Sequence, residues 1–505
     1  MALAIVYSRA SSGISAPLVT VETHLSNGLP AFNIVGLAEA AVKESRDRVR
    51  SALMNSEFEF PVRRITVNLA PADLPKEGGR FDLPIAIGIL AASGQLPCDI
   101  LEKYEFTGEL ALSGELRSVR GVLPVAMGAC EAGRQLIVPW HNAAEAALVQ
   151  EAQILSAKHL LEVCAHLKGL TSLAVTVVAS GESRQRVSSV DLSDVKGQLQ
   201  AKRALEIAAA GRHSLLLVGP PGSGKTMLAS RLTSILPELS DQAALEVAAI
   251  ASVSRNGFDF SAWKTMPFRA PHHSSSSVAL VGGGRPPQPG EISLAHHGVL
   301  FLDELPEFSR PVLECLREPL ESGYITISRA AFQTVFPAEF QFMTAMNPCP
   351  CGYAGSLRDE CRCSAEQIKR YVGRISGPLL DRVDMHVQVA RLPSNLLADK
   401  ESARPETSAV VRDRVLKARE TQLERQQKCN AVLSVPEIDR FCALNASARL
   451  ILGQAMEKFN LSARVYHRIL KVARTIADLE GQDIDERHLA ESLLYRCLDK
   501  VKATV

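Results

Sequence analysis

The sequence predicts an α/β protein of about two or three domains. At 505 residues, the chain is too long for one ordinary domain. A hydrophobic content of 46% and a charged content of 22% are typical of a globular protein with an ample core. Strand-like and helical segments alternate over most of the chain, and the C-terminal part shows helical periodicity alone. These observations predict α/β domains followed by an all-helical one.

The first domain is predicted to span residues 1–175. Apolar residues recur at helical spacing over residues 39–55. Residues 83–92 are apolar enough for a helix that is buried on all sides. Short apolar runs between these helices predict strands. The expected strands include residues 2–7, 65–69 and 136–138.

A second α/β domain is predicted over residues 195–391. It follows residues 176–194, which are rich in Ser, Val and charge without a helical period and therefore predict a linker. The domain begins with helix and strand patterns in alternation. Its first expected elements are the helix 198–210, the strand 214–218 and the helix 225–236.

The C-terminal part, residues 409–505, is predicted to be entirely helical. A stretch rich in Pro, Ser and charge, residues 392–408, separates it from the second domain and predicts another linker. Helical spacing of apolar residues then recurs to the end of the chain. The expected helices are residues 409–427, 445–459, 462–479 and 486–501.

A glycine-rich segment between a predicted strand and helix has the pattern of a phosphate-binding loop. Its glycines allow backbone N–H groups to surround phosphate oxygens, and the helix N-terminus adds partial positive charge. Lys225 is expected to reach the β- and γ-phosphates of ATP, and Thr226 to bind Mg²⁺. The loop consists of Gly219, Pro220, Pro221, Gly222, Ser223, Gly224, Lys225 and Thr226.

Polar residues follow two further predicted strands. Residues 298–302 form an apolar run that ends in Asp303 and Glu304, and residues 340–345 end just before Asn347. Beside a phosphate loop, Asp303 suits Mg²⁺ coordination and Glu304 suits activation of water. Asn347 could orient that water near the γ-phosphate. The sequence therefore predicts a nucleotide-hydrolysing site.

Four of the eleven cysteines lie close together in the chain. Two Cys-x-Cys pairs separated by a short loop offer four thiolates, which is the ligand set that structural Zn²⁺ prefers. The spacing within each pair is shorter than the commoner one, so a cysteine-rich surface loop stays an alternative. The candidate zinc ligands are Cys349, Cys351, Cys361 and Cys363.

Two predicted insertions interrupt the second domain. Residues 270–291 are rich in Gly and Pro, which predicts a loop or hairpin, and contain His272 and His273. These histidines are candidates for DNA contact or ordinary surface residues. Strand-like runs on either side of a short turn predict a hairpin over residues 322–337. The net charge is only +1, so any nucleic-acid surface must be a local basic lining.

The order of these motifs resembles an AAA+ ATPase. Three stretches are similar to its magnesium-chelatase-like branch, and within that branch the chain resembles the ComM/YifB family of DNA branch-migration helicases. The resemblance extends from the N-terminal domain to the helical lid. The stretches are Phe268-Arg-Ala-Pro-His-His273, Gly290-Glu-Ile-Ser-Leu-Ala295 and Phe301-Leu-Asp-Glu-Leu-Pro-Glu-Phe308.

The resemblance implies a homo-hexamer that couples ATP hydrolysis to movement on single-stranded or branched DNA, in recombination and natural transformation. It implies that Arg382 is an arginine finger acting on a neighbour's ATP, with Arg374 as the alternative. By the same resemblance, Arg464 occupies the lid position that would sense the γ-phosphate, with Arg468 and Arg474 nearby on the same predicted helix as alternatives. Arg329 takes the place of a basic residue near the tip of a pore hairpin. Recombination proteins are the partners that this role implies.

The N-terminal domain resembles the Lon protease domain, on the stretches Asp73-Leu-Pro-Lys-Glu-Gly-Gly79 and Arg120-Gly-Val-Leu-Pro124. At the position where the resemblance implies a catalytic serine, this chain has Arg80. The catalytic lysine of that domain would fall within residues 125–132, which contain no lysine here. A nucleophile without its base cannot act, and here both are missing. We therefore expect DNA binding or ring assembly from this domain, and no proteolysis.

We expect a cytoplasmic protein. Residues 1–6 are too short an apolar run for a signal peptide, and residues 83–96 are too few to span a bilayer. Two alternatives to a DNA motor stay open. One is the motor subunit of a chelatase-like complex, and the other is a protein-remodelling motor.

Overall fold

The structure is a computed structural model, and it describes nine ranges of the chain. Most of the predicted linker 392–408, the centre of the linker 176–194, the tip of the hairpin 322–337 and the side chain of Arg329 lie outside them. The first residues of the predicted helix 39–55 also lie largely outside. The described residues are 3–36, 42, 44–177, 190–284, 287–329, 332–355, 360–391, 406–459 and 461–496.

The N-terminal domain is built on a mixed seven-stranded sheet. Its strand order is β3-β4-β2-β1-β5-β8-β9, with β2 antiparallel to both β1 and β4. The predicted strands at residues 2–7, 65–69 and 136–138 correspond to β1, β4 and β8. The strands are β1 (Leu3–Arg9), β2 (Leu18–Ser26), β3 (Ala31–Val35), β4 (Arg64–Ala70), β5 (Tyr104–Phe106), β8 (Gln135–Pro139) and β9 (Ile154–Ala157).

Helix α3 (Asp82–Ala92) packs on this sheet as the predicted buried helix. Each of its residues is buried, because it lies against β1 and β2 on one side and α2 on another. A helix enclosed in this way needs apolar residues all round, which explains its uniform composition. The other helices of the domain are α2 (Ser45–Asn55), α4 (Val122–Glu131), α5 (Ala143–Ala146) and α6 (Leu160–Leu167).

The second domain contains a five-stranded parallel sheet with the order β11-β14-β17-β10-β18. Every residue of β10, β14 and β17 is buried, as expected where helices cover both faces of a parallel sheet. Helices α7 (Leu199–Gly211) and α8 (Lys225–Ile235) flank β10 in the chain. The strands are β10 (Leu215–Val218), β11 (Phe268–Arg269), β14 (Val299–Leu302), β17 (Gln341–Met346) and β18 (Met385–Gln388).

Both insertions are present, and one differs from the prediction. The predicted hairpin is formed by β15 (Tyr324–Arg329) and β16 (Phe332–Pro337), which pair antiparallel. Residues 270–291 contain a short helix, α10 (Ser277–Val281), as well as the two-residue strands β12 (Gly282–Gly283) and β13 (Gln288–Pro289). The hydroxyl of Ser276 caps α10 by accepting a hydrogen bond from the N–H of Ala279, so a loop or hairpin alone was an incomplete expectation.

The C-terminal helices pack on the second domain as a lid. The predicted helix 486–501 is too long, because α21 ends at Leu494 and Arg496 forms a β-bridge with His386. Among the described residues, no helix combines the length and apolarity needed to cross a bilayer. The main helices are α17 (Ser408–Gln426), α18 (Val435–Phe441), α19 (Ala446–Phe459), α20 (Ala463–Glu480) and α21 (Glu486–Leu494).

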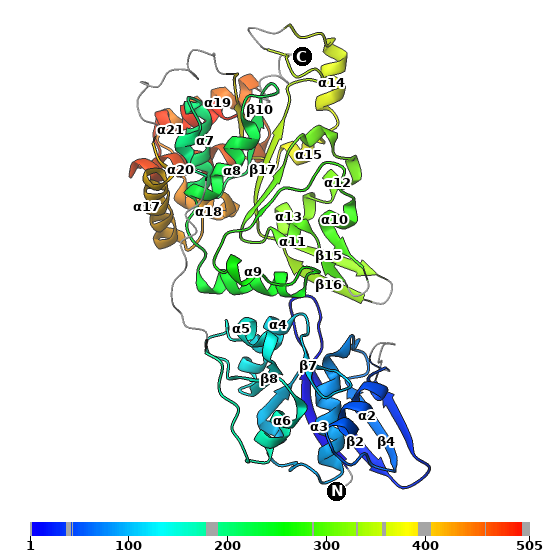
Figure 1. Cartoon of the computed structure of the whole chain (residues 1–505). Coiled ribbons are helices and arrows are strands. Elements are labelled where there is room, and N and C mark those ends of the chain that lie inside the picture. The colour runs from blue at the N-terminus through cyan, green and yellow to red at the C-terminus, as the bar shows by residue number, and fades with distance from the viewer. Residues whose placement is uncertain are drawn as a thin grey trace.

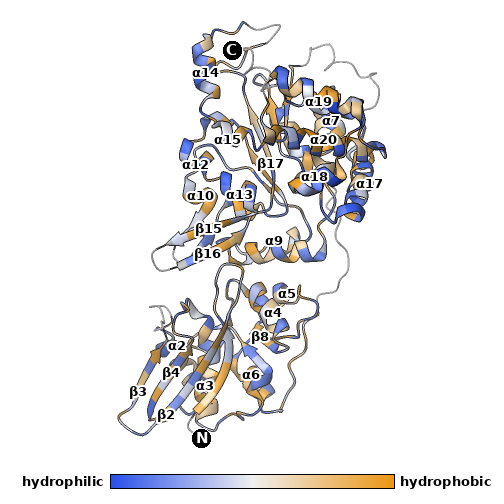
Figure 2. Cartoon of the chain, turned by 180° about the vertical axis from the view of Figure 1, so that it is seen from behind, coloured by the Kyte–Doolittle hydropathy of each residue, from blue (hydrophilic) through white to orange (hydrophobic). Residues whose placement is uncertain are grey.

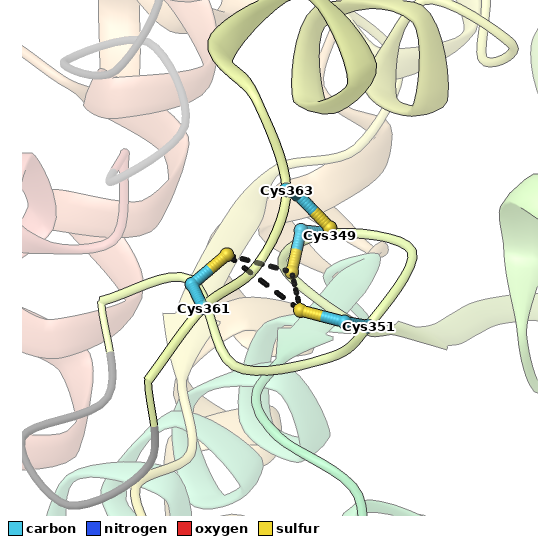
Figure 3. A group of neighbouring side chains, drawn as sticks. All are labelled: Cys349, Cys351, Cys361 and Cys363. Carbon is cyan, nitrogen blue, oxygen red and sulfur yellow. Dashed lines mark hydrogen bonds between the residues drawn. The ribbon is translucent and has the colours of Figure 1, made fainter.

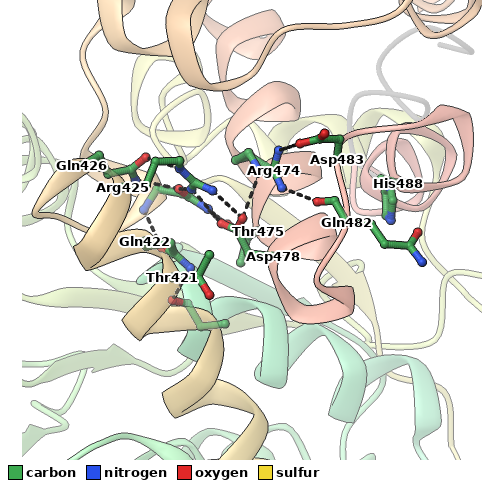
Figure 4. A network of polar contacts seen from close by, with 12 residues as sticks. Thr421, Gln422, Arg425, Gln426, Arg474, Thr475, Asp478, Gln482, Asp483 and His488 are labelled. Atoms are coloured by element: carbon green, nitrogen blue, oxygen red, sulfur yellow. Dashed lines mark hydrogen bonds and ion pairs between the residues drawn. The ribbon is translucent and has the colours of Figure 1, made fainter.

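A buried polar network joins α17 and α20 (Figure 4). The carboxylate of Asp478 accepts hydrogen bonds from Arg425 at 2.7 and 2.9 Å and from Arg474 at 3.0 Å. Thr475 on the same helix is hydrogen-bonded to His213, which precedes β10, over 2.7 Å. Because these groups are shielded from water, their pairing fixes the lid against the strand that leads to the phosphate loop.

The N-terminal domain contacts the second domain through α4, which lies beside α9 (Asp241–Val253) in both views of the chain (Figures 1 and 2). The N–H of Gly121 donates to the carbonyl of Ser252 over 3.0 Å. A second contact joins the β1–β2 turn to the hairpin, where a Cβ at Gly13 would lie 2.8 Å from Cγ2 of Thr334. The domain therefore touches β16 directly.

Candidate nucleotide site

The phosphate loop lies where β10 ends and α8 begins. Its neighbours in the parallel sheet, β17 and β18, end at the same edge, since Val218 pairs with Met346 and Gln388. Such an edge is where open α/β sheets bind ligands. A Cβ at Gly219 would lie 2.2 Å from the carbonyl oxygen of Val389, so only glycine fits at the first position of the loop.

Lys225 is buried and lies inside the loop. Its Nζ donates hydrogen bonds to the carbonyl oxygens of Gly219 and Pro220 at 2.8 and 3.0 Å, and to Oδ1 of Asn347 at 3.1 Å. Burial lowers the pKa of Lys225, while the nearby carboxylates of Asp303 and Glu304 oppose that shift. Asn347, which follows β17, therefore meets the loop lysine.

Two further groups have the chemistry that Mg²⁺ and phosphate require. The hydroxyl of Thr226 donates to Oδ2 of Asp303 over 2.5 Å, which brings the two expected Mg²⁺ ligands together. The hydroxyl of Ser223 is buried and has no hydrogen-bond partner among the described residues. A buried hydroxyl without a partner is costly, and a phosphate oxygen would satisfy it. The donor set therefore fits Mg²⁺-bound ATP.

Glu304 adopts a left-handed backbone conformation at the tip of β14, with φ at 53°. Its Oε2 lies 3.2 Å from Nδ1 of His273, which belongs to the first insertion. His272 stacks beside His273 with ring centroids 4.1 Å apart, and its own Nδ1 contacts the hydroxyl of Ser274. Sequence reasoning missed this contact between His273 and Glu304, although both residues were singled out separately.

Arg382 and Arg374, the two candidates for the arginine finger, differ in exposure. The side chain of Arg382 is only 9% exposed, donates to the carbonyl of Pro378 over 2.8 Å and pairs with Glu321. The side chain of Arg374 is 54% exposed and pairs with Glu307 over 3.0 Å. Both arginines are held by carboxylates of the same chain.

The three arginines of α20, Arg464, Arg468 and Arg474, differ in their ion-pair partners. Arg468 pairs with the buried carboxylate of Asp384, and Arg474 pairs with Asp478 over 3.0 Å. The positive charge of Arg468 helps to hold the pKa of Asp384 well below its usual range despite burial. Arg464 is exposed at the start of α20, and no described residue makes an ion pair with it. Of the three, Arg464 alone is exposed and without an ion-pair partner among the described residues.

Four cysteines lie close together after β17 (Figure 3). We call this group, Cys349, Cys351, Cys361 and Cys363, the cysteine knuckle. The Sγ atoms of Cys349, Cys351 and Cys361 lie 3.3 to 3.7 Å apart, and Cys363 completes a group whose sulfur atoms all lie within 4.8 Å of one another. Four thiolates at about 2.3 Å from a tetrahedral Zn²⁺ lie about 3.8 Å apart. The sulfur positions therefore fit the ligand set predicted from the spacing.

The hairpin carries Arg329 to its end. Arg329 is the last residue of β15 and pairs with Phe332, the first residue of β16, so it stands next to the turn. The base of the hairpin is buried in the second domain through Ile325 and Phe336. The base of the hairpin is thus fixed in the second domain, and the backbone of Arg329 lies at the opposite end.

The parallel sheet, the phosphate loop and the Asp-Glu strand define an ATPase of the AAA+ class. Comparison with known protein families narrows this class of ATPase further. Models of the magnesium chelatase subunit ChlI match residues 191–397 and 21–142, and a model of its C-terminal region matches residues 405–496. The second domain is therefore an ATPase domain of the magnesium-chelatase type.

Full-length relatives give the family. The chain is 57% identical over 502 residues to the competence protein ComM of Haemophilus influenzae, covering 99% of this chain and 98% of the relative. It is 52% identical over 503 residues to the uncharacterized protein YifB of Escherichia coli, with the same coverage. A magnesium-chelatase 67 kDa subunit of Heliobacterium mobile is 24% identical over 34% of the chain. The chain belongs to the ComM/YifB family.

Proposed function

We propose that this protein is an ATP-driven DNA helicase that promotes branch migration during homologous recombination and natural transformation. The observation that carries the proposal is a hydrolysis site joined to a projecting hairpin. Strand β17 follows the hairpin directly and ends at Met346, just before Asn347, which accepts a hydrogen bond from Lys225. A relative named competence protein, matched over nearly its full length, supports DNA as the load.

The motor works as a homo-hexamer, with each active site completed by the next subunit. Lys225 and Ser223 hold the phosphates, Thr226 and Asp303 hold Mg²⁺, and Glu304 takes a proton from the attacking water. Arg382 of the neighbouring subunit stabilises the charge that develops on the transferred phosphate. Arg464 of the lid reports the presence of the γ-phosphate, because it is exposed while Arg468 is engaged with Asp384.

DNA passes the hairpins at the centre of the ring. One Arg329 per subunit forms a basic collar that follows phosphates without reading sequence. This local collar suits a chain whose net charge is only +1. His272 and His273 lie on the other insertion, and the contact of His273 with Glu304 gives that insertion a route from DNA to the hydrolysis site.

The N-terminal domain is a Lon-protease-like domain that supports ring assembly or DNA binding. Arg80 occupies the position of the missing catalytic serine and donates a hydrogen bond to the carbonyl of Arg120 over 2.9 Å. A guanidinium in this place is no nucleophile. The domain's contacts with α9 and β16 suit a role in supporting the motor.

The cysteine knuckle holds a structural Zn²⁺. Its four sulfur ligands leave no coordination position open, which distinguishes a structural site from a catalytic one. Elemental analysis of the purified protein tests this, and less than about half a zinc ion per chain contradicts it.

The alternative function is a motor subunit of a chelatase-like or protein-remodelling complex. The match of all three regions to models of the chelatase subunit ChlI favours it. A chelatase-like motor requires a partner complex and gains nothing from DNA. DNA dependence of ATP hydrolysis therefore separates the two functions.

The deciding experiment compares the wild type with Glu304→Gln on three-stranded and four-stranded DNA junctions. We expect the wild type to exchange strands with ATP and to hydrolyse ATP faster with DNA. Glu304→Gln should bind ATP and DNA without exchanging strands. If branched DNA neither raises the hydrolysis rate nor binds the ATP-loaded protein, the helicase proposal is wrong.

A further inference from the structure

The cysteine knuckle and the phosphate loop leave the same edge of the parallel sheet. Strands β17 and β10 are adjacent and parallel, and the N–H of Gly219 donates to the carbonyl of Met346 over 3.2 Å. The chain then turns through Asn347 into Cys349. The two loops are therefore neighbours because of the strand order, although they are far apart in the sequence.

The tip of the phosphate loop rests against the backbone of the knuckle. Gly352 has φ at +88°, and a Cβ there would lie 2.5 Å from Cδ and 2.8 Å from Cγ of Pro221. Its N–H donates to the carbonyl of Cys349 over 2.9 Å, which closes a turn between two of the cysteines. The ring of Pro221 is thus packed on a turn that contains two of the cysteine ligands, Cys349 and Cys351.

The base of the phosphate loop meets the same segment. Asn347 lies two positions before Cys349, and its Oδ1 accepts the hydrogen bond from Lys225. Segment 347–352 therefore touches the phosphate loop at its tip and at its lysine. A change in the path of this segment would move both contacts together.

Among the described residues, sulfur contacts between Cys361 and the pair Cys349 and Cys351 join the two arms of the knuckle. Cys349 is buried, but the other three cysteines are only partly buried. Thiols are weak hydrogen-bond donors and acceptors, so four of them hold a loop poorly without a metal ion. Four thiolates around Zn²⁺ would hold both arms of the knuckle rigidly.

We propose that the metal-bound knuckle braces the phosphate loop, so that occupancy by Zn²⁺ controls the affinity for ATP. The inference rests on the proposed zinc and ATP sites but is independent of the load that the motor drives. Without the metal, the phosphate loop spends only part of its time in the binding conformation. If that fraction is about one tenth, the apparent Kd for ATP rises about tenfold.

The test compares zinc-loaded with zinc-depleted full-length protein. Zinc is released with an organomercurial thiol reagent and EDTA, the thiols are regenerated with dithiothreitol, and the metal content is measured by elemental analysis. Binding of a fluorescent ATP analogue with Mg²⁺ is then followed by anisotropy. We expect about tenfold weaker binding after depletion, recovery when Zn²⁺ is added, and faster hydrogen exchange in residues 219–226.

Two glycine variants separate the brace from a general effect of metal loss. Gly352→Ala should keep its zinc but weaken nucleotide binding, because the new Cβ collides with Pro221. Gly355→Ala is the matched control, since Gly355 also has a positive φ of +77° but no atom lies within 4 Å of its Cβ position. Equal nucleotide affinities for Gly352→Ala and Gly355→Ala would overturn the proposal.

Each result also distinguishes the brace from the function proposed above. Unchanged affinity and unchanged hydrogen exchange in folded, zinc-depleted protein would refute the brace, as would purified protein without zinc. A zinc-dependent affinity together with no response to DNA would leave the brace standing and refute the helicase. Failure of the zinc-loaded protein to bind the ATP analogue would refute the nucleotide site itself.

Discussion

The Nδ1 atom of His273 lies 3.2 Å from Oε2 of Glu304, so an insertion of the ATPase domain touches the carboxylate at the tip of β14. Both side chains are partly exposed, and such pairs contribute at most about 1 kcal/mol. This contact is therefore strong enough to bias the position of Glu304 and weak enough to be broken during a catalytic cycle.

Replacement of His273 by alanine should free Glu304 from this contact. We expect basal ATP hydrolysis to rise by up to about fivefold, the rate equivalent of 1 kcal/mol, and stimulation by DNA to fall. The measurement is ATP turnover with and without branched DNA. His272→Ala is the matched control, because His272 contacts Ser274 and should leave the basal rate unchanged. Equal effects of both substitutions would contradict a specific role for His273.

Lys225→Ala and Glu304→Gln should fail at different steps. Loss of Lys225 removes the buried cation that meets the phosphates, so both ATP binding and turnover should be lost, the latter by at least about a hundredfold. Loss of the Glu304 carboxylate should abolish turnover alone. Anisotropy of a fluorescent ATP analogue and phosphate release measure the two steps separately. Turnover at the wild-type rate in either variant would rule out the assigned role.

The arginine finger can be identified by mixing two inactive variants. Arg382→Ala should lower turnover by about a thousandfold because the transition-state charge loses its partner. If Arg382 acts on a neighbour, mixed rings with Lys225→Ala subunits contain some intact interfaces, and activity should return on mixing. The same experiment with Arg374→Ala tests the alternative. Recovery with Arg374→Ala and full activity of Arg382→Ala alone would transfer the role to Arg374.

Arg329→Ala should uncouple hydrolysis from DNA. Basal turnover should stay at the wild-type level, since the hairpin supplies no residue of the proposed hydrolysis site, while DNA stimulation and strand exchange should decline. The salt dependence of DNA binding should also become less steep, because each subunit contributes one phosphate contact fewer. Loss of basal turnover in this variant would argue against a pore role.

His296 should make the ATPase domain sensitive to acid. Burial lowers its pKa to about 4, and the N–H of Glu339 donates to its Nδ1, so Nε2 carries the proton that contacts Glu246. The unfolded histidine has a pKa near 6.5 and binds its proton first, so stability present above pH 6.5 is lost as the pH falls toward 4. The loss should reach about 3 kcal/mol.

Urea unfolding of the wild type and of His296→Gln between pH 7.5 and 4 measures this effect. The variant carries no titrating group at this position, so its stability should fall less over the same range. Identical pH profiles for the two proteins would show that other groups cause the acid sensitivity.

Features that depend on neighbouring residues in the chain could be predicted from the sequence. The phosphate loop between β10 and α8, the acidic tip of β14 and the buried helix α3 follow from contiguous patterns, because backbone conformation and apolar periodicity are local. The hairpin β15–β16 could also be predicted, because two strand-like runs around a short turn are a local pattern. Predictions failed where a local pattern continued past a tertiary contact, as when α21 stopped at Leu494 and Arg496 paired with His386.

Only the tertiary structure decided which distant residues meet. Strand order places the knuckle beside Pro221, and the path of the first insertion places His273 at Glu304. Packing pairs Arg468 and Arg474 with carboxylates but gives Arg464 no ion-pair partner among the described residues, although all three arginines look alike in the sequence of α20. Such pairings depend on how separate elements pack, and neither composition nor spacing along one chain encodes them. The sequence by itself determined the chemistry of the ATPase site, whereas packing decided which groups of distant segments lie around it.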